Sequence, residues 1–95
     1  MKKVWIFMIK RFFISNGTDY AMAINDEEIK VFCNYSDACV FRQKRFDYYK
    51  DLFESMKTFE RDYFTTNFFE LTEKDGSRMI FQIIENNLEE STKIL

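Results

Sequence analysis

The sequence predicts a small α+β domain: an antiparallel five-stranded sheet in the order β-β-β-α-β-β, with one long helix packed on one face. The chain has 95 residues, which suits a single domain covering 1–95. Apolar runs rich in aromatic and β-branched residues stand near both ends of the chain. Between them lies a segment whose apolar residues recur three and four positions apart, which is typical of a helix.

The first third of the chain predicts three strands joined by short turns. Lys3–Ile14 is apolar on both alternating sets of residues, which is typical of a central strand that is covered on both faces. Asn16-Gly17 is a strong hairpin signal, and Tyr20–Ile24 follows it as the second strand. The polar run 25–28 predicts another turn before a third strand at Ile29–Cys33.

A helix is expected next. Ser36 is a suitable N-cap, and Asp37 favours the first turn because it complements the helix dipole. The helix is predicted from Asp37 to about 57, with fraying as far as 62. Its predicted buried stripe consists of Phe46, Tyr49, Phe53 and Met56. An alternative interpretation pairs 29–33 with 38–42 as a hairpin and begins the helix near Lys44.

The last third predicts a second hairpin. Tyr63–Glu73 and Ser77–Glu85 are interpreted as its strands, with the turn at Gly76. Met79, Phe81 and Ile83 alternate with less apolar residues, so one face of this hairpin is expected to be buried. The tail 86–95 is mostly polar and is expected to form a last helical turn or to remain loose.

The side chains that enzymes most often use are missing or badly spaced. The chain has no histidine, the most common general acid or base at neutral pH, and no glycine-rich phosphate loop. Cys33 and Cys39 are separated by five residues, which is neither a zinc nor a redox spacing. Cys39 lies near the predicted helix start, where a reactive thiolate is conceivable, but a structural cysteine is the favoured interpretation. We therefore expect no enzyme activity, no metal and no cofactor.

The N-terminal segment imitates a signal peptide only weakly. The apolar run after Met1-Lys2-Lys3 ends at Lys10, and no small-residue cleavage site follows it. No run approaches the roughly 18 apolar residues of a membrane span. A cytoplasmic protein without a membrane partner is expected. The chain is rich in residues of AT-rich codons and has no proline, which suggests a low-GC bacterium, a phage or a plasmid as the source.

The aromatic content predicts a protein-binding surface. The chain contains 12 Phe, 5 Tyr and 1 Trp, while one helix covers only one face of a sheet. The uncovered face is expected to expose some of Trp5, Phe7, Phe12, Phe13, Phe68 and Phe69. The predicted function is that of a non-enzymatic accessory or inhibitor protein, encoded by a phage or mobile element. It would bind a host protein, for example a defence protein of the CRISPR type, or a second copy of itself.

The alternative is a small nucleic-acid-binding regulator that uses Arg42, Lys44 and Arg45 on the helix. A three-stranded sheet followed by a helix that opens Ser-Asp-Ala resembles, in topology, the small DNA-binding modules of phage integrase arms. That resemblance covers about half the chain and implies no base-reading residue. The net charge of −2 favours protein as the partner over nucleic acid. The acidic second half also raises the hypothesis of nucleic-acid mimicry.

Overall fold

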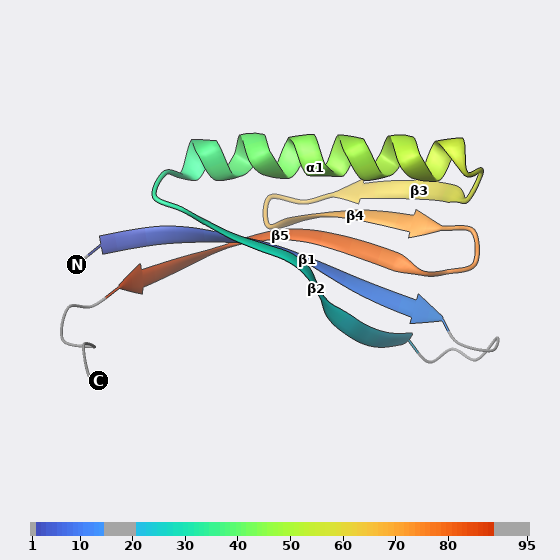
Figure 1. The fold of residues 1–95 in the computed structure, drawn as a ribbon, viewed down its shortest axis with the longest axis horizontal. Coiled ribbons are helices and arrows are strands. Elements are labelled where there is room, and N and C mark those ends of the chain that lie inside the picture. Colours follow the sequence, from blue (N-terminus) through green and yellow to red (C-terminus); the bar gives the residue numbers. More distant parts are fainter. Residues whose placement is uncertain (1, 15–20, 89–95) are drawn as a thin grey trace.

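The fold is a five-stranded antiparallel sheet with one helix packed on it, as the sequence predicts (Figure 1). The computed structural model describes residues 2–14 and 21–88, with the side chains of 2–13 and 28–87. The elements in chain order are β1 (Lys2–Ile14), β2 (Ala21–Phe32), α1 (Tyr35–Ser55), β3 (Phe59–Phe64), β4 (Phe68–Glu73) and β5 (Arg78–Leu88). The fold class is confirmed, although two strands rather than three precede the helix.

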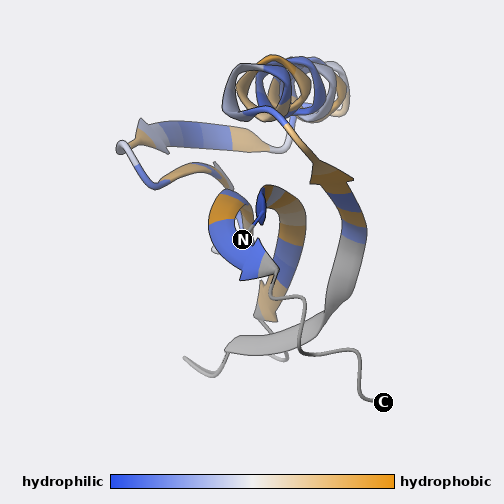
Figure 2. Cartoon of the chain, turned by 90° about the vertical axis from the view of Figure 1, so that its left-hand side faces the viewer, coloured by the Kyte–Doolittle hydropathy of each residue, from blue (hydrophilic) through white to orange (hydrophobic). Residues whose placement is uncertain are grey.

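The strands lie in the spatial order β2-β1-β5-β4-β3, and every neighbouring pair is antiparallel. β1 pairs with β2 on one side and β5 on the other, so its predicted central position is confirmed. Figure 2 shows α1 above one face of this strongly twisted sheet. Among the described residues, no second helix covers the opposite face.

The turn predicted at 25–28 is wrong, because β2 runs through it without a break. Its pairing with β1 shifts between Ile9 and Lys10 and again between Lys10 and Phe12. Both shifts leave extra residues on β2, where β-bulges accommodate them. An edge strand tolerates such bulges and polar residues because one of its sides has no partner. The predicted Asn16-Gly17 turn lies outside the described residues.

The helix begins close to its predicted position, which excludes the later start near Lys44. The cap is Asn34, not Ser36: its Oδ1 accepts hydrogen bonds from the amides of Ser36 at 2.8 Å and Asp37 at 3.3 Å. The helix ends at Ser55, and Lys57 follows in the left-handed region with φ of 63°. The amide of Thr58 then donates to the carbonyl of Phe53 at 2.9 Å, which closes the C-terminus and leads directly into β3. No helix in the described part of the chain is long and apolar enough to span a membrane.

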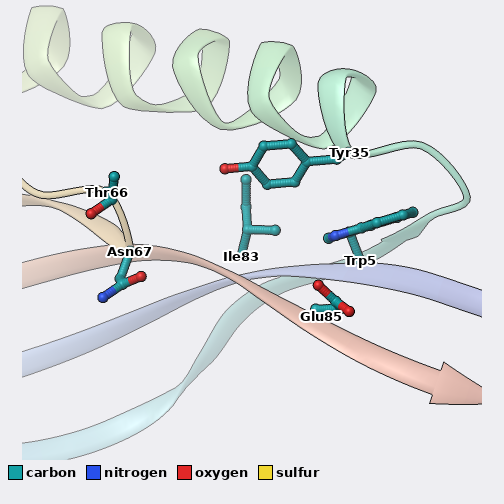
Figure 3. A pocket seen from close by; sticks show the side chains of 6 residues that line it. All are labelled: Trp5, Tyr35, Thr66, Asn67, Ile83 and Glu85. Atoms are coloured by element: carbon teal, nitrogen blue, oxygen red, sulfur yellow. The ribbon is translucent and has the colours of Figure 1, made fainter.

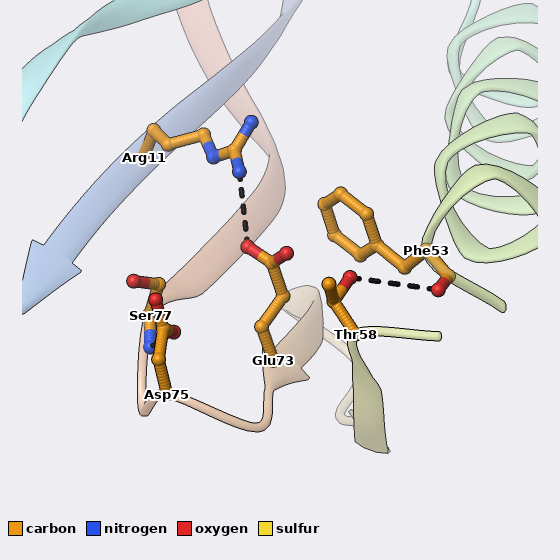
Figure 4. Close-up of polar contacts among 6 residues, drawn as sticks. All are labelled: Arg11, Phe53, Thr58, Glu73, Asp75 and Ser77. Atoms are coloured by element: carbon orange, nitrogen blue, oxygen red, sulfur yellow. Dashed lines mark hydrogen bonds and ion pairs between the residues drawn. The ribbon is translucent and has the colours of Figure 1, made fainter. Parts of the chain in front are cut away.

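The single strand predicted over 63–73 is in fact two strands, β3 and β4, joined by a tight turn at 65–67. The hydroxyl of Thr65 accepts hydrogen bonds from the amides of Asn67 at 3.1 Å and Phe68 at 2.9 Å. A threonine that bonds amides two and three residues ahead replaces the usual glycine or proline turn signal. The turn predicted at Gly76 is confirmed, with φ of 94°, and Asp75 caps the amide of Ser77 at 2.8 Å (Figure 4).

The hydrophobic core lies between α1 and the odd-numbered side chains of β1, β4 and β5. Its fully buried members are Phe7, Ile9, Phe46, Phe53, Leu71, Met79 and Phe81. Phe46 is the centre of an aromatic cluster, with ring centroids 5.4 Å from Phe69 and 5.5 Å from Phe81. Edge-to-face packing of this kind stabilises beyond the area that it buries.

The predicted helix stripe is confirmed at Phe46 and Phe53 and is wrong at Met56. Met56 follows the last helical residue and is 50% exposed, because the helix ends before this side chain reaches the core. Arg42 takes a buried position on the stripe instead. Its long apolar stem packs in the interior while the guanidinium stacks on Phe69, 4.0 Å from the ring centroid.

Candidate protein-binding face

The face of the sheet opposite α1, here called the open face, carries the even-numbered side chains of β1 and β5 and their cross-strand neighbours. Its apolar members are Val4, Ile6, Met8, Phe12, Ile29, Val31, Tyr63, Phe68, Ile80 and Ile84. Ile29 and Val31 are each 57% exposed, and Tyr63 is 56% exposed. Register explains the grouping, because Val31 and Ile84 both lie opposite Ile6, one on each side. The result is an aliphatic and aromatic surface that crosses all five strands.

Basic side chains border this apolar surface. Lys10 lies on β1, Arg61 on β3 and Arg78 on β5, in register with open-face neighbours. Arg78 lies 5.2 Å from the ring centroid of Phe12 and 3.5 Å from the carboxylate of Glu70. Two acidic residues share this face by register: Glu70 on β4, and Asp26 on β2 opposite Lys10. The basic residues of this face outnumber its acidic residues.

The predicted contact residues divide between the two faces of the sheet. Phe12 and Phe68 lie on the open face, whereas Trp5, Phe7, Phe13 and Phe69 lie on the helix side. Phe7 is wrong as a contact residue, because it is fully buried beneath Phe41. Phe69 is packed against the core in the same way. Neighbouring residues of a strand point to opposite faces, so Phe12-Phe13 and Phe68-Phe69 are each split between the two faces.

The open face also contains residues that sequence reasoning missed. Ile29 and Val31 were expected in a short third strand, but no contact role was predicted for them. Their alternation with Glu28 and Lys30 was the available signal, since one alternating set of a strand faces one side of the sheet. Which side that would be depends on the pairing with β1, which the bulges of β2 shift.

The three basic residues of the alternative hypothesis do not form one exposed patch. Arg42 is only 6% exposed. Arg45 donates to the carboxylate of Glu28 at 2.9 Å and lies 5.1 Å from the ring of Tyr48. Lys44 is exposed. Of these three residues, only Lys44 is both exposed and without an ion pair in the described part of the chain.

A pocket of about 490 Å³ lies on the helix side of the sheet, between the start of α1 and the turn at 65–67 (Figure 3). It is lined by Trp5, Tyr35, Thr66, Asn67, Ile83 and Glu85. The rings of Trp5 and Tyr35 are 6.1 Å apart and tilted by 54°. Glu85 lies opposite Trp5 in the β-ladder, and its carboxylate is 3.3 Å from the ammonium of Lys3.

Hydrogen bonding to Cys39 raises the pKa of the Tyr35 hydroxyl above its ordinary value, while the charge of Arg42 opposes that shift. Cys39 itself is half-buried on α1, and Cys33 is exposed just before the helix. Tyr35 is therefore held as a neutral phenol over the normal pH range. The structure places it in the pocket as a ring surface and a hydrogen-bonding group, not as an ionised base.

Comparison with known proteins gives no functional assignment. No family model, no curated protein and no solved structure matches this chain. That the protein is not an enzyme and that it is cytoplasmic both stay predictions. The open face and the helix-side pocket are the two described surfaces from which function is inferred below.

Thermal melting is expected to be unchanged by a chelator or a reductant. Both cysteines are free thiols, and the described residues contain no group of three side chains that could hold a metal ion. Neither additive should therefore remove a folding constraint. Differential scanning fluorimetry with EDTA and with a phosphine reductant tests this. A drop of several degrees with either compound would show that a metal or a disulfide stabilises the fold.

Proposed function

We propose that this protein is a protein-binding module whose open face docks an apolar partner surface with an acidic rim. The observation that supports the proposal is the apolar set of the open face, in which Ile29 and Val31 on β2 and Tyr63 on β3 are each more than half exposed. Surfaces of this kind on small proteins commonly mark interaction sites. The contact is stoichiometric and needs no catalytic group.

The charge of the rim determines the kind of partner. Three basic residues, Lys10, Arg61 and Arg78, outnumber the two acidic residues of this face, Glu70 and Asp26, so its border is basic by one charge. Two copies packed face to face would bring like charges together, which costs several kcal/mol in the unfavourable arrangements seen at interfaces. An acidic rim on the partner would instead match these groups and increase the association rate. The proposal therefore favours a different protein over a second copy.

The prediction of an accessory or inhibitor role, encoded by a phage or mobile element, would fit this binding mode. A small protein that blocks a target needs only a complementary surface and a slow dissociation rate. The identity of the target stays a prediction, and a host defence protein is one member of that class.

The experiment is a selection of displayed random peptides against the immobilised protein, followed by titration of the synthesised winners. We expect the enriched peptides to combine apolar residues with Asp or Glu. Val31→Asp should weaken their binding at least about tenfold, because it places a charge within the apolar surface that the peptide contacts. The matched control is Val40→Asp on α1, since Val40 is 54% exposed, almost the same fraction as Val31. This control should retain the wild-type affinity.

Three outcomes would contradict the proposal. Enrichment of basic peptides would show that the partner surface is basic, not acidic. If Val31→Asp and Val40→Asp bound the peptides with equal affinity, the peptides would not contact the open face. A dimer that sedimentation detects and that Val31→Asp dissociates would make a second copy the partner.

Separately, we expect no duplex or single-stranded nucleic acid to bind more tightly than about 10 μM at about 150 mM salt. Submicromolar, salt-sensitive binding would favour the nucleic-acid alternative.

A further inference from the structure

Arg42 is a buried cation without a counter-charge. It forms no ion pair with any described carboxylate, and its Nε is buried without a hydrogen-bond partner. Arg11 provides a direct comparison, because its Nε is also buried without a partner. Unlike Arg42, however, its guanidinium forms an ion pair with the carboxylate of Glu73 at 3.0 Å. Leaving a charge in the interior without its partner is costly. A buried arginine of this kind is expected to gain stability when an anion approaches it.

The helix-side pocket is next to this arginine. Nη1 of Arg42 donates to the backbone oxygen of Asn67 at 3.4 Å, a long hydrogen bond, and Asn67 lines the pocket. Tyr35, which also lines the pocket, lies on α1 seven residues before Arg42. Arg42 does not line the pocket itself, but its guanidinium contacts the pocket wall through Asn67.

The Trp5 indole N–H and the Asn67 side-chain amide can donate hydrogen bonds in the pocket, whereas the Tyr35 hydroxyl is hydrogen-bonded to Cys39. Figure 3 shows the indole nitrogen of Trp5 turned toward Ile83, and the Tyr35 hydroxyl pointing toward the Thr66–Asn67 turn. The described residues provide no hydrogen-bond acceptor for the Trp5 N–H. Glu85 is the one carboxylate among the lining residues, and it forms an exposed ion pair with Lys3. Trp5, Tyr35 and Ile83 supply apolar walls.

We propose that this pocket binds a carboxylate attached to an apolar or aromatic body, with Arg42 as the counter-charge. The ring or aliphatic part packs on Trp5, Tyr35 and Ile83, and the carboxylate lies at the inner end, toward Arg42 and Asn67. Two sources share this chemistry: a small organic acid, and the C-terminus or an acidic side chain of a protein. The inference depends on the pocket alone, so it holds or fails independently of the open face.

The probe is phenylacetate, compared with its neutral analogue phenylacetamide and with phenethylamine as the cationic analogue. Trp5 is the only tryptophan of the chain, so its fluorescence and its indole N–H signal in NMR report on this pocket alone. We expect phenylacetate to bind with a dissociation constant on the order of 1 mM, which is usual for a ligand of this size. Phenylacetamide should bind about tenfold to a hundredfold more weakly, because it lacks the charge-assisted hydrogen bonds.

Arg42→Met tests the role of the guanidinium. This variant keeps the length of the side chain and removes the charge, so phenylacetate should bind it no better than phenylacetamide. Its melting temperature should equal or exceed that of the wild type, because an unpaired buried cation is removed. Lys44→Met is the matched control: it makes the same change in net charge at an exposed position and should leave binding intact.

The proposal is overturned if phenylacetamide or phenethylamine binds as tightly as phenylacetate, or if folded Arg42→Met retains the wild-type affinity. Should Arg42→Met fail to fold, the comparison of the three ligands on the wild-type protein decides by itself. A peptide that ends in Phe with a free carboxylate distinguishes the two sources. Affinity about tenfold above that of phenylacetate indicates a protein terminus, and equal or lower affinity indicates a small organic acid.

Discussion

Phe53→Ala is expected to lower the free energy of unfolding by about 3–5 kcal/mol. Phe53 is 2% exposed and lies between Tyr49 of α1 and the guanidinium of Arg11 on β1. Removing its ring would leave a cavity that the surrounding β-strands are too rigid to fill. Stabilities of small domains are usually about 5–15 kcal/mol, so this variant should be close to the limit of folding. Urea denaturation followed by circular dichroism measures the change.

Met56→Ala provides the internal comparison. Both residues belong to the helix stripe that the sequence predicts, but Met56 is half exposed beyond the end of α1. Its truncation should change the unfolding free energy by less than about 0.5 kcal/mol. If the two variants lost similar stability, the helix would have to extend further than Ser55 and bury Met56.

Glu73→Ala should be the most disruptive polar substitution, with a loss of about 2–4 kcal/mol. Arg11 is enclosed by the rings of Phe13 and Phe53, at 4.8 and 5.4 Å, and its Nη2 donates to Glu73 at 3.0 Å (Figure 4). Both side chains are less than one-fifth exposed. Removing the carboxylate would leave the guanidinium without its counter-charge in a poorly hydrated site.

The double variant Arg11→Met/Glu73→Leu separates the charge from the packing. It removes both charges and keeps apolar volume, so its stability should be close to that of the wild type or higher. Glu85→Ala is the exposed control: its partner Lys3 is solvent-facing, and the loss should stay below about 1 kcal/mol. A loss for Glu73→Ala as small as that for Glu85→Ala would show that water reaches the Arg11–Glu73 pair.

Several parts of the fold follow from local signals. The alternation of Met79, Phe81 and Ile83 correctly predicts one buried face of β5, because side chains alternate along any strand. The 3–4 spacing around Phe46 and Phe53 correctly predicts the buried side of α1. The apolar character of β1 on both faces correctly predicts its central position. These features depend on residues that are close together in the chain.

Other features depend on groups that meet only after folding. The polar run 25–28 would form a turn by itself, yet pairing with β1 keeps it extended, with bulges in place of a turn. The hydroxyl of Thr65 stabilises the β3–β4 turn. This turn contains no glycine or proline from which it could have been predicted. Arg42 and Arg45 have the same charge and lie three residues apart, but one is buried against Phe69 and the other pairs with Glu28.

The sequence by itself determined that this chain forms an antiparallel sheet with one helix on one face, because periodicity and aromatic content are local properties. It also predicted an uncovered face, since one helix covers only one side. Only the tertiary structure decided which aromatic of each pair faces outward, because a strand's register depends on its neighbours and shifts at every bulge. The tertiary structure alone also brought Arg42 of α1 to the backbone of Asn67 in the β3–β4 turn, a contact that forms only when α1 packs on the sheet.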